Sequence, residues 1–328
     1  MIYLGEQKEA KEKYFRKVKC WVNKKLRGSY KKNNPDGYKC EIDNCDVCKV
    51  KFRKYDAGNF TDFILEHLEK IIKSKPSEML NIENDLKAKW VENGLGDEAT
   101  FNRESKKLFV EKGYKSWFIS HAINYNLSEW LDQHTCAYCN KQYILVARKK
   151  DGKKGINCQF DHWFDKEKHP LFALSFYNLI PSCSVCNSSI KSTSSFTTET
   201  HLHPYVDKDI SERFSFSYRF GDFDKNEISI ADEKKLDKKT KRTLKDLGTK
   251  LVYKRHGTKE LQDLIDLRKK YSENYLNILL NDTFHSKIGL SKEECYRLIF
   301  GIEFDSDDYH KRPFSKFKKD IIQELLSN

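Results

Sequence analysis

Two Cys-x-x-Cys pairs constrain this sequence more than any other feature. They stand at Cys136 and Cys139 and again at Cys183 and Cys186. The two-residue gap lets both sulfurs of a pair reach one metal ion, and two pairs complete a tetrahedral site with Zn–S distances of about 2.3 Å. The alternative, four ordinary core thiols or a pair of disulfides, is less favoured for two such pairs. We therefore expect one structural Zn²⁺ whose four ligands leave no open position for chemistry.

Any chemistry must then come from polar residues near the cysteine pairs. Four stand out, namely Asp161, His162, Asn178 and Asn187. Hydrolysis of a phosphodiester needs a base for the attacking water and a cation that stabilises charge on the phosphate and the leaving oxygen. An unperturbed imidazole, with a pKa of about 6.5, suits the base at neutral pH. Carboxylate and amide oxygens suit Mg²⁺ or Mn²⁺.

Each of these residues has a plainer interpretation when taken alone. An Asp-His pair is more commonly a hydrogen-bonded structural pair, and an Asn after a Cys is most commonly a helix cap. Their occurrence together, inside a zinc frame, favours the functional interpretation.

The order of these residues resembles that of the HNH endonucleases, specifically the zinc-braced ββα-metal type. Asp161 and His162 end a first expected strand (156–163), Asn178 begins a second (178–181), and Asn187 lies on a helix that the second cysteine pair opens near residue 184. The resemblance implies an α+β fold with a ββα-metal nuclease core.

The same resemblance implies a role for each residue. His162 would activate water as general base, Asp161 and Asn187 would hold a single catalytic Mg²⁺ or Mn²⁺, and Asn178 would position His162. Lys191 would contact a substrate phosphate, with a solvated lysine at a helix end as an equally favoured alternative.

Three further histidines lie close to the motif. We interpret His169, in the loop between the two expected strands, as structural or as a phosphate contact. His201 and His203 are expected to be buried and hydrogen bonded, although their segment is similar to one in relatives of the family where a histidine lies near the metal.

The N-terminal stretch is basic and holds a second group of cysteines. Residues 1–55 contain 16 Lys and Arg against 7 acidic residues, with aromatic residues between them, a mixture that suits contact with nucleic acid or a helix with an aromatic core face. Cys20, Cys40, Cys45 and Cys48 can form a second zinc site. Only one gap is a two-residue one, so ordinary thiols around an irregular loop remain the alternative.

The composition indicates which class of molecule the protein binds. The net charge of +12 and pI of about 9.0 favour a polyanion such as nucleic acid, with DNA favoured, although a lysine-rich composition also follows from an AT-rich genome. No apolar run is long enough for a membrane span and no signal peptide is recognisable, so we expect a cytoplasmic protein without a membrane partner. We expect Cys158 and Cys295 to be buried apolar residues.

Helical and strand patterns suggest three regions. Residues 1–125 form a mostly helical basic region, with helices expected at 6–26, 59–72 and 76–91. Residues 126–205 form the zinc-braced HNH domain, with a short extended run at 142–148. Residues 206–328 form a hairpin of 214–220 with 227–230, followed by helices, one opened by a capping box from Ser291 to Glu294.

The sequence thus predicts a metal-dependent HNH endonuclease that hydrolyses phosphodiester bonds of nucleic acid. It is similar in detail to the HNH components of Septu-type and retron-linked bacterial antiphage systems, which implies a defence role and an ATPase partner. The alternative is a non-catalytic zinc-dependent nucleic-acid-binding or scaffolding module with a vestigial site. A vestigial site should have lost a member of the set, and all four residues are present.

Overall fold

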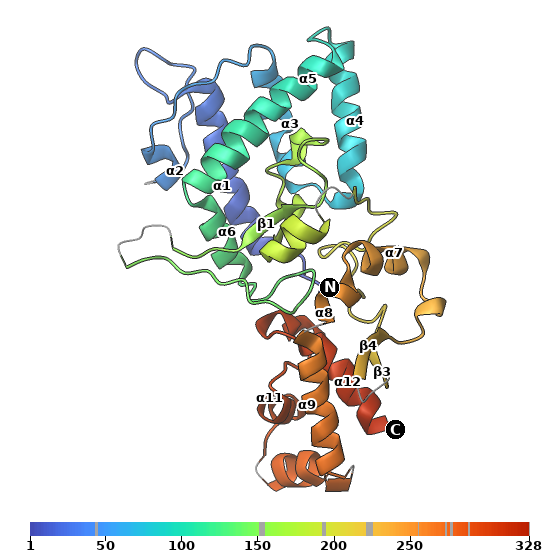
Figure 1. The fold of residues 1–328 in the computed structure, drawn as a ribbon. Coiled ribbons are helices and arrows are strands. Elements are labelled where there is room, and N and C mark those ends of the chain that lie inside the picture. The colour runs from blue at the N-terminus through green and yellow to red at the C-terminus, as the bar shows by residue number, and fades with distance from the viewer. Residues whose placement is uncertain are drawn as a thin grey trace. The chain divides into compact units, whose positions relative to one another are not determined.

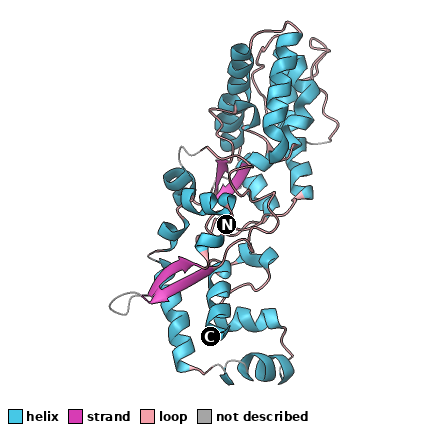
Figure 2. Ribbon diagram, turned by 90° about the vertical axis from the view of Figure 1, so that its right-hand side faces the viewer, coloured by secondary structure: helices cyan, strands magenta, loops and turns pink. Residues whose placement is uncertain are grey.

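The protein is a mostly helical chain with two small sheets, as Figure 2 shows. The computed structural model describes the chain except residues 43–44, 151–154, 192–194, 221–225, 255, 273, 276–277, 288 and 328. Two compact units are present. Unit 1 comprises residues 1–6, 132–160 and 181–328, and unit 2 comprises residues 7–131 and 161–180. These units are not the three consecutive regions expected from the sequence, because the expected nuclease region contributes to both.

Unit 2 is a helical body (Figure 1). Its helical segments are α1 (Lys8–Arg27), α2 (Asp46–Lys49), α3 (Phe60–Lys73), α4 (Pro76–Glu92), α5 (Glu98–Ser105), η1 (Lys106–Phe118) and α6 (Ile123–Leu131), with η2 (Pro170–Phe172) and η3 (Phe176–Asn178). The three helices expected here are confirmed, because apolar side chains recur at helical spacing and Pro76 occupies the first turn of α4.

Aromatic side chains fill the centre of unit 2. The rings of Trp21 and Trp117 stack with centroids 4.8 Å apart. Phe60, Trp90 and Phe101 meet edge to face or tilted, with centroids between 5.7 and 6.1 Å apart. The aromatic residues of the N-terminal stretch are thus partly core residues, and Trp21 is fully buried. This favours the structural interpretation for that side chain.

The first sheet joins β1 (Gln159–His162) to β2 (Leu179–Ser182). The chain passes from unit 1 to unit 2 within β1 and returns within β2. The two expected strands are confirmed: β1 is shorter than the expected 156–163, and β2 lies one residue beyond the expected 178–181. Beyond β2 the chain forms η4 (Val185–Lys191), the helix expected after the second cysteine pair.

The rest of unit 1 is a hairpin with helices. Strand β3 (Phe216–Phe220) pairs antiparallel with β4 (Asn226–Ile230), and Phe216 lies opposite Ile230. The following elements are η6 (Glu233–Lys235), α7 (Lys238–Asp246), α8 (Thr249–Tyr253), α9 (His256–Lys270), η7 (Ile278–Lys287), α11 (Lys292–Phe300), η8 (Ser306–Lys311) and α12 (Ser315–Ser327). The hairpin and the capping box at Ser291 are both confirmed.

Two smaller expectations were wrong. Residues 142–148 do not form a regular strand, since only isolated bridges occur at Tyr143 and Ala147. Cys158 is partly exposed rather than buried, whereas Cys295 is buried as expected. No helix among the described residues combines the length and hydropathy that crossing a bilayer requires.

A buried ion pair fastens α12 to the hairpin in unit 1. The ammonium group of Lys316 lies 2.5 Å from Asp320 Oδ2 and donates to the Phe214 carbonyl at 2.9 Å. Asp320 also accepts the Phe216 N–H at 2.8 Å. Both side chains are nearly inaccessible, and burial lowers the pKa of Lys316 and raises that of Asp320.

Replacing only one residue of the Lys316–Asp320 ion pair should destabilise unit 1 far more than replacing both. We expect Asp320→Ala to destabilise unit 1 by about 3–5 kcal/mol, because the Lys316 ammonium would stay buried without its counter-ion. The double variant Lys316→Met with Asp320→Leu should regain most of that loss. Thermal unfolding combined with hydrogen exchange of β3 measures this, and equal destabilisation of the two variants would contradict it.

Candidate metal centres and the histidine loop

The first candidate centre is the cluster of Cys136, Cys139, Cys183 and Cys186 in unit 1. All four residues are buried, and their sulfur atoms all lie within 4.8 Å of one another. Tetrahedral Zn²⁺ with bonds of about 2.3 Å would need sulfurs about 3.8 Å apart. The cluster therefore fits zinc after small side-chain adjustments.

Local backbone bonds explain how the two pairs meet. The Ala137 N–H donates to the Pro181 carbonyl at 3.2 Å and so joins the two segments. Each pair lies in a turn: Asn140 N–H bonds the Cys136 carbonyl at 2.8 Å, and Asn187 N–H bonds the Cys183 carbonyl at 3.0 Å. The predicted grouping of these four cysteines is confirmed.

Electrostatics in the cluster also favour a cation. Burial raises the pKa of Cys136, whereas hydrogen bonds from Cys136, Cys183 and Cys186 lower that of Cys139. Four thiolates in one buried site would repel one another, and a divalent cation is what lets them coexist.

Asn140 connects this cluster to the C-terminal segment of unit 1, a role that sequence reasoning missed. Its backbone adopts positive φ, and its buried side chain donates to Thr135 Oγ1 at 2.9 Å and to the Tyr309 carbonyl at 2.7 Å. Its backbone carbonyl accepts the Phe314 N–H at 2.6 Å. Tyr253 adds a hydrogen bond to the Cys139 carbonyl at 2.6 Å. The only sequence signal was an Asn directly after a cysteine pair, which is also typical of an ordinary turn.

The second candidate centre is in unit 2. Cys20 of α1 lies with Cys40, Cys45 and Cys48, and their sulfurs are again within 4.8 Å of one another. Cys20 Sγ is 3.6 Å from Cys40 Sγ, and burial raises the pKa of Cys20 to about 12. The sequence hypothesis that these four residues gather is confirmed, so two four-cysteine groups can each hold a zinc ion.

The candidate base, His162, lies buried at the end of β1. Its Nε2 is 3.0 Å from the Ala173 carbonyl oxygen, and its ring meets the edge of Tyr114 with centroids 4.3 Å apart. Because a carbonyl can only accept, Nε2 carries the hydrogen in this bond. In the neutral ring Nδ1 is then the basic nitrogen.

Asn178 holds the loop that contains Ala173. Its fully buried side chain accepts the Phe164 N–H at 2.7 Å and donates to the carbonyls of Phe164 at 3.1 Å and Phe172 at 3.0 Å. Asn178 therefore acts on His162 through the loop, with the Ala173 carbonyl as the atom that touches the imidazole. This mode of positioning was not visible in the sequence.

Helices of unit 2 anchor the same loop. Tyr14 of α1 donates its hydroxyl hydrogen to the Leu174 carbonyl at 3.0 Å. Ser175 donates to the Ile71 carbonyl of α3 at 2.6 Å. The acceptor of His162 is thus fixed on both sides by buried hydrogen bonds, which limits how far the imidazole can turn.

The candidate ligands Asp161 and Asn187 belong to different units. Asp161 is a buried residue of β1 in unit 2. In unit 1, Asn187 Nδ2 donates to Gln159 Oε1 at 2.9 Å, which leaves the amide oxygen as the ligating atom. Gln159 was not predicted, and no sequence signal indicated it.

Lys191 is buried rather than solvated. Its ammonium group lies 5.2 Å from the centroid of the Phe196 ring. The solvated alternative is therefore wrong, and the observed contact favours a packing role. Its predicted contact with a phosphate stays a prediction.

The neighbouring histidines have structural partners. His169 Nδ1 lies 2.6 Å from the buried carboxylate of Glu83. His201 is buried, bonds Asp246 at 3.0 Å and stacks on Phe196, and burial lowers its pKa. His203 accepts the Tyr205 N–H at 3.1 Å. The expectation that His201 and His203 are buried and hydrogen bonded is confirmed.

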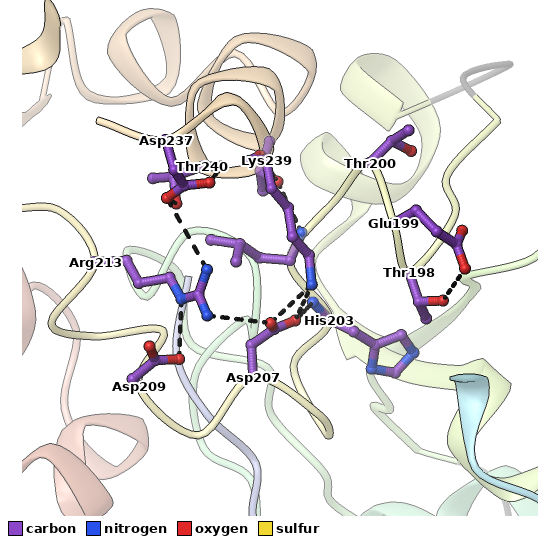
Figure 3. Close-up of polar contacts among 12 residues, drawn as sticks. Thr198, Glu199, Thr200, His203, Asp207, Asp209, Arg213, Asp237, Lys239 and Thr240 are labelled. Carbon is purple, nitrogen blue, oxygen red and sulfur yellow. Dashed lines mark hydrogen bonds and ion pairs between the residues drawn. The ribbon is translucent and has the colours of Figure 1, made fainter. Parts of the chain in front are cut away.

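A charged network surrounds His203 (Figure 3). The backbone N–H of His203 donates to Asp207 at 2.6 Å, and Lys239 donates to both oxygens of that carboxylate at 2.8 and 3.1 Å. Arg213 lies 2.9 Å from Asp209 and 4.0 Å from Asp237. Two cations thus bridge three carboxylates, which indicates a structural role for this network within unit 1.

Comparison with known proteins gives one partial match. Over 69 residues the chain is 36% identical to "Protein ea31" of Escherichia phage lambda. The match covers 20% of this chain and 23% of the phage protein. No family model and no solved structure matches.

Metal analysis should find two zinc ions per chain. Cys183→Ser should remove about one, and Cys48→Ser should remove the other, because three thiolates bind zinc more weakly than four. Elemental analysis of the purified proteins measures this, with Cys295→Ser as the control that retains both ions. Full zinc content in either ligand variant would contradict the assignment of that centre.

We call the segment between β1 and β2, which contains Ala173, the histidine loop. Asn178→Ala should loosen this loop. Three buried backbone groups would lose their partner, at about 1–3 kcal/mol each, so we expect unit 2 to lose roughly 3 kcal/mol or more. Hydrogen exchange at Phe164 and nearby amides should rise. Asn81→Ala, at an exposed position of α4, is the matched control. Unchanged exchange at Phe164 would mean that Asn178 does not hold the loop.

Proposed function

We propose that this protein is a metal-dependent endonuclease of the HNH type that hydrolyses phosphodiester bonds, with DNA as the favoured substrate. The observation that carries the proposal is the hydrogen bond between His162 Nε2 and the Ala173 carbonyl, on a loop that Asn178 holds. This bond favours the tautomer in which Nδ1 can accept a proton from water.

The proposed role of each residue follows from the chemistry of its side chain. His162 takes the proton of the attacking water. The Asp161 carboxylate and the Asn187 amide oxygen would hold Mg²⁺ or Mn²⁺, which when bound stabilises charge on the phosphate and leaving oxygens. The four-cysteine centre supports η4, the helix that carries Asn187, and has no open position for substrate.

The net charge of +12 supports a polyanionic substrate. We extend the proposal, on the sequence resemblance alone, to a role in bacterial antiphage defence together with an ATPase partner. Co-purification of such an ATPase with the tagged protein from its own host tests this extension.

Cleavage assays test the catalytic assignment. The purified protein should nick or cut plasmid DNA with Mg²⁺ or Mn²⁺ and fail in EDTA, and readdition of Mg²⁺ should restore cleavage. His162→Gln should lose at least about 100-fold in rate, since its amide can still donate to the Ala173 carbonyl but cannot act as a base.

Two controls separate catalysis from folding. His134→Gln changes a half-exposed histidine of unit 1 and should cut like the parent. Zinc content and hydrogen exchange at Phe164 in His162→Gln should match the parent. Equal cleavage by His162→Gln and the parent would overturn the role of His162, and a parent inactive on both DNA and RNA would favour the zinc-dependent binding module.

A further inference from the structure

An extended arm leaves the first cysteine centre in unit 1. We define the arm as residues 141–150 and 155–158, which run as two neighbouring segments (Figure 1). Ala147 and Ile156 exchange both backbone hydrogen bonds, at 2.8 and 2.9 Å, so they lie directly opposite each other. A Cβ atom on Gly155 would lie 2.1 Å from the Ala147 carbonyl oxygen, and glycine therefore permits this close approach.

The arm has one buried side and one exposed apolar face. Ile144 is only 5% exposed, whereas its neighbours Tyr143 and Leu145 are 55% and 58% exposed. Alternation along an extended chain places Tyr143, Leu145 and Ala147 on the same face. Ile156 lies opposite Ala147, shares that face and is 59% exposed.

Three cationic residues follow Ala147 in the sequence. Arg148, Lys149 and Lys150 are consecutive and exposed, and residues 141–150 include no acidic residue. Lys149 and Lys150 form no ion pair with another described residue. An apolar strip that ends in cations is complementary to a surface with apolar patches between rows of negative charge.

Two hydrogen bonds hold the root of the arm. Lys141 donates to the Val252 carbonyl at 2.7 Å, and its backbone N–H bonds Cys139 Sγ at 3.4 Å. The arm is therefore attached to the cysteine centre itself. The major groove of duplex DNA, about 12 Å wide, admits two paired chain segments, and the Ala147–Ile156 bridge pairs the two segments of the arm.

We propose that the arm binds duplex DNA, with Lys149 and Lys150 on backbone phosphates and the face of Leu145 and Ile156 in the groove. This deepens the proposed nuclease function and rests on it, since it identifies how the enzyme holds duplex substrate. Anionic membrane surfaces share the charge but not the groove, and they serve as the competing outcome of the test.

Binding is measured with full-length, zinc-loaded protein in the His162→Gln background, on a fluorescent 30-base-pair duplex and across salt concentrations. Lys149→Gln with Lys150→Gln should weaken binding roughly tenfold and reduce the salt slope by about 2, because two phosphate contacts are lost. Lys208→Gln with Lys234→Gln removes the same charge from exposed positions elsewhere in unit 1 and should change neither quantity.

A second test variant and its control examine the apolar face. Leu145→Ser with Ile156→Ser should weaken duplex binding roughly tenfold and leave the salt slope unchanged, since no charge is lost. Leu251→Ser with Leu298→Ser, at positions 71% and 63% exposed, is the control and should bind like the parent.

The outcomes separate this proposal from the proposed function. If the parent cuts DNA and both arm variants bind duplex as tightly as the His162→Gln protein without arm substitutions, the arm proposal is overturned and the nuclease stands. If the parent neither binds nor cuts DNA, the nuclease proposal fails and the arm proposal falls with it. If the Leu145 and Ile156 pair reduces binding to phosphatidylserine vesicles but not to DNA, the arm is a membrane contact instead.

Discussion

The requirement that four buried sulfurs share one site governs the organisation of unit 1. Cys136 and Cys139 come from one turn, and Cys183 and Cys186 from another, so the cluster fixes two distant segments at one point. Four thiolates this close together would repel one another, and burial disfavours the charged form of Cys136. A bound cation turns the same repulsion into a stabilising contact, and folding of the surrounding turns then depends on metal binding.

The histidine loop obeys a different constraint, one of backbone hydrogen bonding. The chain between β1 and β2 has no long element of its own, so its buried N–H and carbonyl groups need side-chain partners. Asn178 and Tyr14 supply them, and Ser175 of the loop adds a hydrogen bond to the Ile71 carbonyl of α3. The consequence is a fixed Ala173 carbonyl, and through it a defined tautomer of His162. The hydrogen bonds that stabilise the loop therefore also orient the imidazole.

Sequence patterns predicted what depends on local spacing. The periodicity of α1, α3 and α4, the hairpin of β3 with β4, and both cysteine groups follow from residue type and separation. The partners of the candidate site did not follow. Tyr114 and Gln159 contact His162 and Asn187 through tertiary packing and carry no periodic or motif signal. Lys191 shows the same limit, because only packing against Phe196 tells a buried lysine from a solvated one at a helix end.

Donor chemistry keeps the proposed metals apart. Thiolates select zinc, whereas carboxylate and amide oxygens select Mg²⁺ or Mn²⁺. A closed four-thiolate site exchanges no ligand with substrate, and an oxygen site must keep water positions open. In the proposed nuclease, loss of cleavage in a chelator would therefore have two separable causes, loss of the proposed catalytic ion or collapse of a cysteine centre. Recovery on addition of Mg²⁺ alone identifies the first, because Mg²⁺ cannot replace zinc among sulfurs.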